Sequence, residues 1–163
     1  MLARLLPGPD ADGFPKRLTQ TRAERLTTVA GERDLNALLK DMKPEMQPGI
    51  FVFCTIPPNE SIPAAVDPLL TFREQEGTTL VIQREEAEAA GLHHAFASPM
   101  ITLTVHSALD AVGFLAAITA RLAEAGISVN AVSAFHHDHL FVPDDRADDA
   151  MALLRELSKE QAS

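Results

Sequence analysis

Apolar residues recur along this chain with two spacings, one typical of helices and one typical of strands. A helical spacing over residues 35–42, with Leu35, Leu38, Leu39 and Met42 on one stripe, predicts a helix that Pro44 ends. The run Ile50–Ile56 is apolar throughout and rich in β-branched and aromatic residues, which predicts a buried central strand. A proline-rich loop follows to about residue 67. We also expect a short strand over 26–30.

The middle of the chain carries the pattern of a hairpin followed by a short helix. Strands are expected over 69–74 and 78–83, joined by a turn in which Gly77 supplies a positive φ. Residues 84–90 read as a short acidic helix that ends at Gly91. An extended segment over 93–98 then leads to Pro99, where we expect a boundary between two modules.

The second half repeats the alternation of strands and helices. A strand over 100–105 precedes Ser107-Ala-Leu-Asp110, which matches a capping box at the start of a helix running to about Ala125. Gly126 ends that helix and Ile127 makes its C-terminal apolar contact. A strand over 128–135, a tight turn at His136–His139 and a returning strand over 140–142 follow. Asp144 or Asp145 is expected to cap a last helix, whose inner face is Ala150, Met151, Leu154 and Leu157.

The order β-α-β-β-α therefore occurs twice, which indicates an α+β protein of two ferredoxin-like βαββαβ modules with antiparallel sheets and helices on one face. We expect a flexible extension over 1–25, a first module over 26–99 and a second over 100–163. The second module lacks a last strand, so its sheet has an open edge. A strand from the other module or from another subunit would cover that edge.

Composition narrows the classes of function. The chain has 163 residues, of which 46% are hydrophobic and 23% charged, typical of a soluble globular protein. No apolar run is long enough to span a membrane, and a net charge of -9 argues against nucleic acid as a partner. Cys54 is the one cysteine, so the fold needs no disulfide. The first 25 residues hold basic groups and prolines but no signal-peptide core, and we expect a cytoplasmic protein.

The strand, loop and helix over 101–142 carry a family resemblance. The segment ending in LAEAGISV, the strand bearing Asn130 and the ending HDHLFVP resemble an ACT domain. Residues 31–56 resemble the same family less specifically. The chain is similar to stand-alone tandem-ACT proteins, to the ACT pair of aspartate kinases and to the CASTOR-type arginine sensors. The resemblance implies a non-catalytic regulatory protein that binds an amino acid or analogue at a module or subunit interface. It also makes an enzyme or regulator a possible partner. The open sheet edge and the family's pairing of modules together lead us to expect a homo-oligomer, a dimer or tetramer, and we expect no cofactor.

The same resemblance points to the loop after the first strand of the second module. The implied ligand-binding residues are His106, Ser107, Leu109, Asp110, Val112 and Gly113, with Asn130, Ala131 and Val132 as the opposite wall. A helix N-terminus suits an α-carboxylate, and Asp110 would accept the ligand ammonium. A plainer interpretation stays open, in which Ser107 and Asp110 only cap their helix, Gly113 only serves close packing and Asn130 only satisfies backbone groups at its strand end. In the matching loop at 31–35, Glu32 and Asp34 are read as capping charges.

Two other functions compete with amino-acid sensing. The cluster His136–His139 has the residue types of a metal site, so a small metal-dependent enzyme is one alternative, although the same residues make an ordinary polar turn. A purely structural dimerisation module is the other. No convergent nucleophile and base are evident, Cys54 falls inside an apolar strand, and we predict no catalytic and no metal-binding residues.

Overall fold

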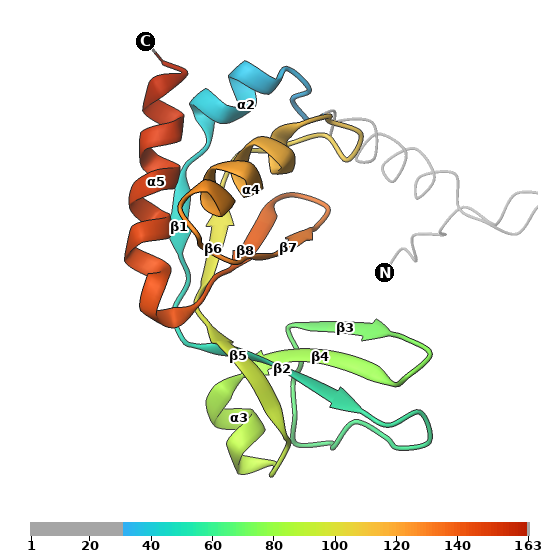
Figure 1. Ribbon diagram of the computed structural model, residues 1–163. Helices are drawn as coiled ribbons and strands as arrows, with labels where there is room; N and C mark the ends of the chain where they lie inside the picture. The colour runs from blue at the N-terminus through green and yellow to red at the C-terminus, as the bar shows by residue number, and fades with distance from the viewer. Residues whose placement is uncertain (1–30, 163) are drawn as a thin grey trace, which may run out of the picture. The chain divides into compact units, whose positions relative to one another are not determined.

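A computed structural model describes residues 31–162 of the chain, and these form two four-stranded antiparallel sheets with helices packed against them (Figure 1). The α+β fold predicted from the sequence is confirmed. The extension expected over 1–25 and the strand expected over 26–30 lie outside the described residues.

The first sheet has the strand order β3-β4-β2-β5 and is built from one continuous stretch of chain. Its strands are β2 (Phe51–Ile56), β3 (Leu70–Arg73), β4 (Thr78–Gln83) and β5 (His94–Ser98). The apolar strand β2 lies between β4 and β5, which confirms the prediction of a central strand. The hairpin turn between β3 and β4 needs its glycine, because a Cβ on Gly77 would lie 2.3 Å from the carbonyl oxygen of Ile56.

One helix, α3 (Arg84–Ala89), covers the first sheet between β4 and β5. Its Ala87 is buried beside Val52, Cys54 and Leu80. Gly91 follows at a φ of 64°, as expected for a glycine that ends a helix. Cys54 is part of this core, and burial raises the pKa of its thiol. Between β2 and β3, where a ferredoxin-like module would place its first helix, the chain forms the proline-rich loop instead.

The second sheet has the strand order β1-β6-β8-β7 and combines distant parts of the chain. Its strands are β1 (Pro44–Met46), β6 (Met100–Leu103), β7 (Asn130–Ser133) and β8 (Asp138–Phe141). Strand β1 runs antiparallel to β6, with Pro44 opposite Leu103 and Met46 opposite Ile101. This position belongs to the last strand of a ferredoxin-like sheet. The expectation that a strand from elsewhere closes this edge is therefore confirmed, and the strand comes from the same chain.

Three helices cover one face of the second sheet, namely α2 (Leu35–Asp41), α4 (Phe114–Glu124) and α5 (Ala147–Glu160) (Figure 1). Their apolar stripes meet Ile101, Leu103 and Leu140 in the largest core of the molecule. Helix α2 packs against α5, where the Ser158 hydroxyl donates to the carbonyl oxygen of Lys40 (2.8 Å). The helix predicted over 35–42 is confirmed, but it contributes its apolar stripe to the second sheet and not to the first.

Aromatic side chains join the two sheets. Phe141 on β8 makes edge-to-face contacts with Phe51 and Phe53 on β2, at ring-centroid distances of 5.9 and 5.6 Å. Met100 and Val81 complete this small buried cluster. These residues lie on the face of the second sheet that is opposite its three helices. The second sheet is therefore covered on both faces.

The last helices end and begin partly as predicted. Helix α4 ends with Gly126 at a φ of 68°, and the Ile127 N–H donates to the carbonyl oxygen of Leu122 (2.9 Å), which confirms the expected C-terminal motif. The expected cap of α5 is wrong. Asp144 and Asp145 lie in a 3₁₀ turn, η1 (Asp144–Arg146), and no side chain of the described residues caps the helix that follows. None of the helices over residues 31–162 has the length and apolar character needed to cross a membrane.

Candidate ligand-binding site

Two loops, here called the paired loops, meet at one end of the second sheet. The first is Glu32–Asp34, which precedes α2, and the second follows β6 and runs to Gly113. The Glu32 N–H donates to the carbonyl oxygen of His106, and the Ala108 N–H donates to that of Glu32, both at 2.9 Å. These bonds form an isolated parallel bridge between Glu32 and Ser107. These two loops occupy matching places in the two predicted modules, and in the structure they are bonded side by side.

The loop before α2 orders its own backbone. Glu32 Oε1 accepts hydrogen bonds from the N–H groups of Arg33 (2.7 Å) and Asp34 (2.8 Å), and these bonds lower the pKa of the Glu32 carboxyl. Asp34 Oδ1 accepts from the Ala37 N–H (2.8 Å) as the N-cap of α2. The interpretation of Asp34 as a capping charge is confirmed, whereas Glu32 bonds to the backbone of the loop before the helix.

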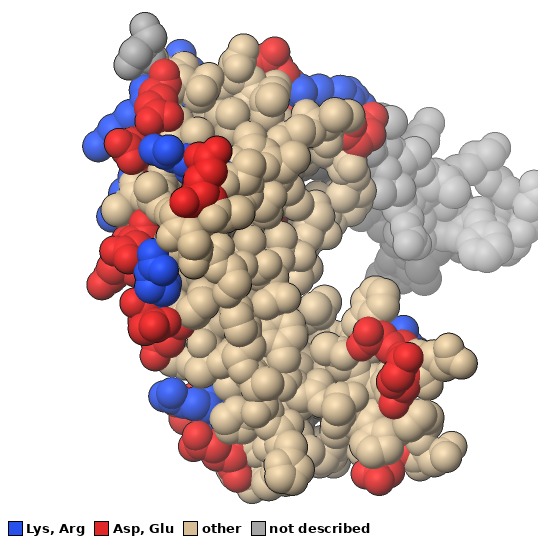
Figure 2. Space-filling model, viewed as in Figure 1, with Lys and Arg blue, Asp and Glu red and all other residues tan. Residues whose placement is uncertain are grey.

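Asp110 makes a paired contact with the opposite loop. The Arg33 guanidinium donates from Nε to Asp110 Oδ1 (3.0 Å) and from Nη2 to Oδ2 (3.1 Å). This pair raises the pKa of Arg33 and lowers that of Asp110. The side chains remain 61% and 69% exposed, respectively, so the pair is open to solvent. In Figure 2, basic and acidic surface areas lie next to each other at this end of the second sheet.

The expected capping box is wrong, because helix α4 starts later than the sequence suggested. Its first residue is Phe114, and Gly113 precedes it at a φ of +93° without a capping side chain among the described residues. A Cβ on Gly113 would lie 3.3 Å from a terminal methyl of Leu35, so this glycine meets both a backbone and a packing requirement. Ser107 and Asp110 are both engaged elsewhere, and residues 107–113 form an open loop.

Ser107 instead contacts a buried acid. Its hydroxyl donates to Asp138 Oδ2 (3.1 Å), and the Ser133 hydroxyl donates to Oδ1 (2.6 Å). Asp138 is 3% exposed, so these two bonds hold a buried carboxylate directly behind the loop. The sequence had placed Asp138 in a polar turn. The turn spans Ala134–His137, and Asp138 and His139 already belong to β8.

The wall expected on β7 is divided between the two faces of the sheet. Val132 lies opposite His139 and Asn130 opposite Phe141, on the face turned toward the first sheet, whereas Ala131 pairs with Leu140 on the helix-covered face. Asn130 is also at the far end of β7 from Ser133, the residue of that strand that reaches the site through Asp138. The structure therefore brings together His106, Ser107, Asp110 and Gly113 but not Asn130.

Two predicted residues present apolar surface at the loop. Leu109 and Val112 are 66% and 82% exposed, on either side of Asp110 in the sequence. A contiguous exposed apolar patch can mark a contact surface, and these two side chains lie three residues apart on the same loop.

The histidines near this loop have separate contacts. The His106 and His136 rings meet edge to face at 5.6 Å, His137 Nδ1 lies 3.3 Å from the Val105 carbonyl oxygen, and His139 Nδ1 lies 3.0 Å from the Thr102 hydroxyl. Burial lowers the pKa of His139, and the neighbouring His137 adds to this. Within residues 31–162 no three histidine, cysteine, aspartate or glutamate side chains are arranged to hold a metal ion.

Comparison with known families decides the broader classification. Two family models, both described as "ACT domain", match residues 30–99 and residues 96–156 of the chain. Together they span most of the chain. The chain belongs to the ACT-domain family.

Solved structures extend this result. A Vibrio cholerae protein of unknown function, described as a possible transport protein, is 44% identical; the match covers 76% of this chain and 95% of that one, with a TM-score of 0.69. An Agrobacterium tumefaciens protein is 20% identical, with 72% and 89% covered and a TM-score of 0.59. The regulatory subunit of aspartate kinase from Thermus thermophilus shares the fold at 8% identity, with 70% and 95% covered and a TM-score of 0.53. A comparison with curated proteins finds no match.

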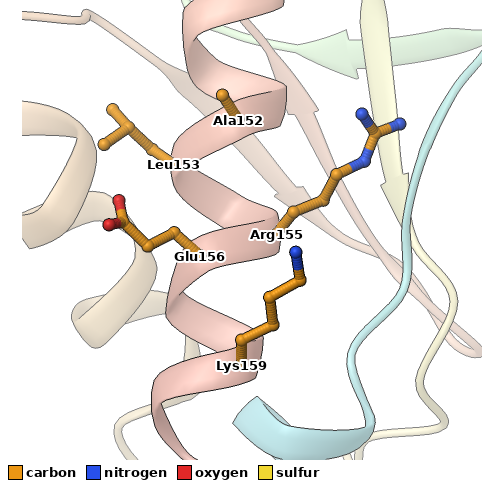
Figure 3. Close-up of a pocket in the computed structure, with 5 residues that line it drawn as sticks. All are labelled: Ala152, Leu153, Arg155, Glu156 and Lys159. Carbon is orange, nitrogen blue, oxygen red and sulfur yellow. The ribbon is translucent and has the colours of Figure 1, made fainter.

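A surface hollow elsewhere in the ACT pair is unrelated to the paired loops. It is lined by Ala152, Leu153, Arg155, Glu156 and Lys159 (Figure 3). All five residues belong to α5, so the hollow follows one helix and has no opposing wall from a second element. A small polar ligand is usually held by groups that converge from several elements, which this hollow does not offer.

Proposed function

We propose that this tandem-ACT protein is a non-catalytic regulator that binds a free amino acid at the paired loops. The observation that carries the proposal is the exposed Asp110 carboxylate on a loop that leads into α4, a helix whose first turn has no side-chain cap among the described residues. An α-ammonium needs a carboxylate, and an α-carboxylate suits free N–H groups at a helix start. The paired loops offer both within a short stretch of chain.

The proposed site uses most of the residues expected from the family resemblance. His106, Ser107, Leu109, Asp110, Val112 and Gly113 form the loop, and Asp138 supports it from behind through Ser107. On β7, Ala131 and Val132 lie on opposite faces, so one of them at most borders a single ligand. Asn130 is too far along the strand, and we leave it out of the site.

The aspartate kinase regulatory subunit that shares this fold supports a regulatory role. By that analogy we propose that ligand binding changes the assembly of this chain with copies of itself or its contact with an enzyme. The exposed Leu109 and Val112 supply apolar surface for such a contact. Binding can act in this way only if the ligand prefers one of two states of the protein.

The test is a thermal-shift screen of the full chain against the twenty L-amino acids, each at 5 mM, followed by calorimetry on every amino acid that stabilises the protein. A ligand at a hundred times its Kd adds about 2.7 kcal/mol to the free energy of unfolding, which a thermal shift detects readily. We expect at least one amino acid to stabilise the protein, and we expect Asp110→Asn to abolish the effect while circular dichroism stays unchanged.

The matched control is Asp67→Asn, which removes an exposed carboxylate from the proline-rich loop of the first half. It should leave the amino-acid effect intact. A flat screen refutes the proposal, and unchanged binding by Asp110→Asn places the site elsewhere. Metal analysis of the purified protein tests the metal-enzyme alternative, which stoichiometric zinc, manganese or iron would favour over ours.

A further inference from the structure

The Arg33–Asp110 pair joins the two loops at the proposed site. Arg33 comes from the loop before α2 and Asp110 from the loop after β6, 77 residues apart in the sequence. The guanidinium meets the carboxylate with two hydrogen bonds, the geometry in which arginine recognises carboxylates most specifically. Two backbone hydrogen bonds between Glu32 and the second loop hold the loops together independently of this pair. If the ion pair opened, the two loops would therefore stay side by side, and both charged groups would remain at the site.

The acids around Arg33 are not equivalent. Glu32 accepts two backbone N–H groups and Asp34 caps α2, so both have structural duties. Among residues 31–162, Arg33 is the only side chain that forms a hydrogen bond or ion pair with Asp110. Ion pairs as exposed as this one contribute little to stability, because water solvates both ends once they separate. The pair is thus a cation and an anion, on two loops whose backbones are bonded to each other, that can exchange partners at little cost.

We propose that the Arg33 guanidinium, more than the N–H groups at the start of α4, binds the ligand carboxylate at this site, and that an α-amino acid binds by exchange with the Arg33–Asp110 pair. The inference rests on the proposed function and names its specificity determinant. The ligand α-carboxylate takes the place of Asp110 on the Arg33 guanidinium, and the ligand α-ammonium takes the place of Arg33 on the Asp110 carboxylate. One ion pair becomes two, and no charge loses its partner.

This exchange determines which molecules can bind. A zwitterion satisfies both protein groups. An amino-acid amide, which lacks the carboxylate, pairs with Asp110 but leaves Arg33 without a partner, and a simple carboxylic acid does the reverse. Once a bound ligand displaces water from the pair, a protein group without a partner is left unsatisfied, so the site should favour the zwitterion over both kinds of analogue. The selected class is therefore α-amino acids with a free carboxylate and a free ammonium group.

The experiment uses calorimetry on the full chain with the amino acid that gives the largest thermal shift, its primary amide and its decarboxylated amine. Against the wild type we expect the amide and the amine to bind at least tenfold more weakly than the amino acid. Arg33→Gln should weaken the amino acid at least tenfold and should not weaken the amine, which forms no pair with Arg33. Arg33→Lys should restore part of the loss, because lysine keeps the charge without the paired donors.

Arg73→Gln is the matched control, since it removes an exposed arginine from β3 of the first sheet. It should leave all three affinities within twofold. If the wild type binds an amino acid and Arg33→Gln binds it within twofold of the wild type, the exchange is wrong and the proposed function stands. If the wild type binds the amino acid and its primary amide with equal affinity, the exchange is wrong, whatever the variants show. If the wild type binds no amino acid, the proposed function fails and the exchange fails with it.

Discussion

Replacing Leu38 by alanine tests the packing of α2 against the second sheet and its other helices. Leu38 is fully buried, in the same core as Ile118 of α4 and Leu154 of α5. The substitution removes every carbon beyond Cβ from a side chain with no exposed surface. It should therefore remove contacts between helices that lie far apart in the sequence.

The expected cost follows from the burial. Losing the transfer free energy of these carbons costs about 2–2.5 kcal/mol, at roughly 0.8 kcal/mol per methylene. The cavity left between packed helices adds to this, because the neighbours relax only in part, so we expect a total of about 3–4 kcal/mol. That is a large share of the stability of an ordinary domain, which is about 5–15 kcal/mol.

The assay is urea unfolding followed by far-UV circular dichroism, because the chain has no tryptophan or tyrosine to report by fluorescence. Leu69→Ala is the matched control, since Leu69 is 52% exposed and its truncation should cost about 0.5 kcal/mol or less. A loss below about 1 kcal/mol for Leu38→Ala, or a loss equal to that of the control, would refute the packing of α2 described above.

Three further predictions concern the loop and its surroundings. Gly113→Ala should destabilise the protein more than Gly126→Ala in the same urea assay. Both glycines have a positive φ, but a Cβ on Gly113 meets Leu35 at 3.3 Å whereas one on Gly126 meets nothing within 4 Å; equal losses would contradict this. Asp138→Ala should cost about 1–3 kcal/mol because it leaves the Ser107 and Ser133 hydroxyls without their acceptor; a neutral result in urea unfolding would show that the buried acid is not needed. Burial lowers the folded-state pKa of His139, so the unfolded chain binds the proton more tightly and the free energy of unfolding falls as the pH drops below about 6.5. His139→Gln should reduce that fall between pH 7.5 and pH 5.5, and an unchanged pH dependence would assign the effect to other groups.

The sequence predicted individual elements well where local chemistry decides them. The apolar run that became β2 and the motif at Gly126 and Ile127 are examples, because burial on both faces and a left-handed glycine each leave a direct mark on the residues. It could not predict where α2 packs. An amphipathic stripe shows that one face is buried but not against which sheet.

The candidate site shows the same limit. The pattern Ser107 to Asp110 fits a capping box, yet Ser107 bonds to Asp138, 31 residues away. A signal for Asp138 was present, because strand alternation places it on the same face as the buried Leu140. Arg33 was part of a recognised loop but had no assigned role, since its partner Asp110 comes from the other half of the chain. Contacts between distant segments are what local patterns do not contain.

The placement of β1 and α2 has a consequence for the order in which the protein can fold during synthesis. Both elements precede the whole first sheet in the chain, but the helix α5 that covers α2 follows all the described strands, ending at Glu160. At a ribosomal speed of about 5–20 residues per second, the apolar stripe of α2 waits roughly 6–24 s for its partner. The first sheet, being continuous in the chain, can form during that interval. Chaperone binding to the nascent chain should therefore concentrate on residues 35–46 and end only once α5 has emerged from the ribosome.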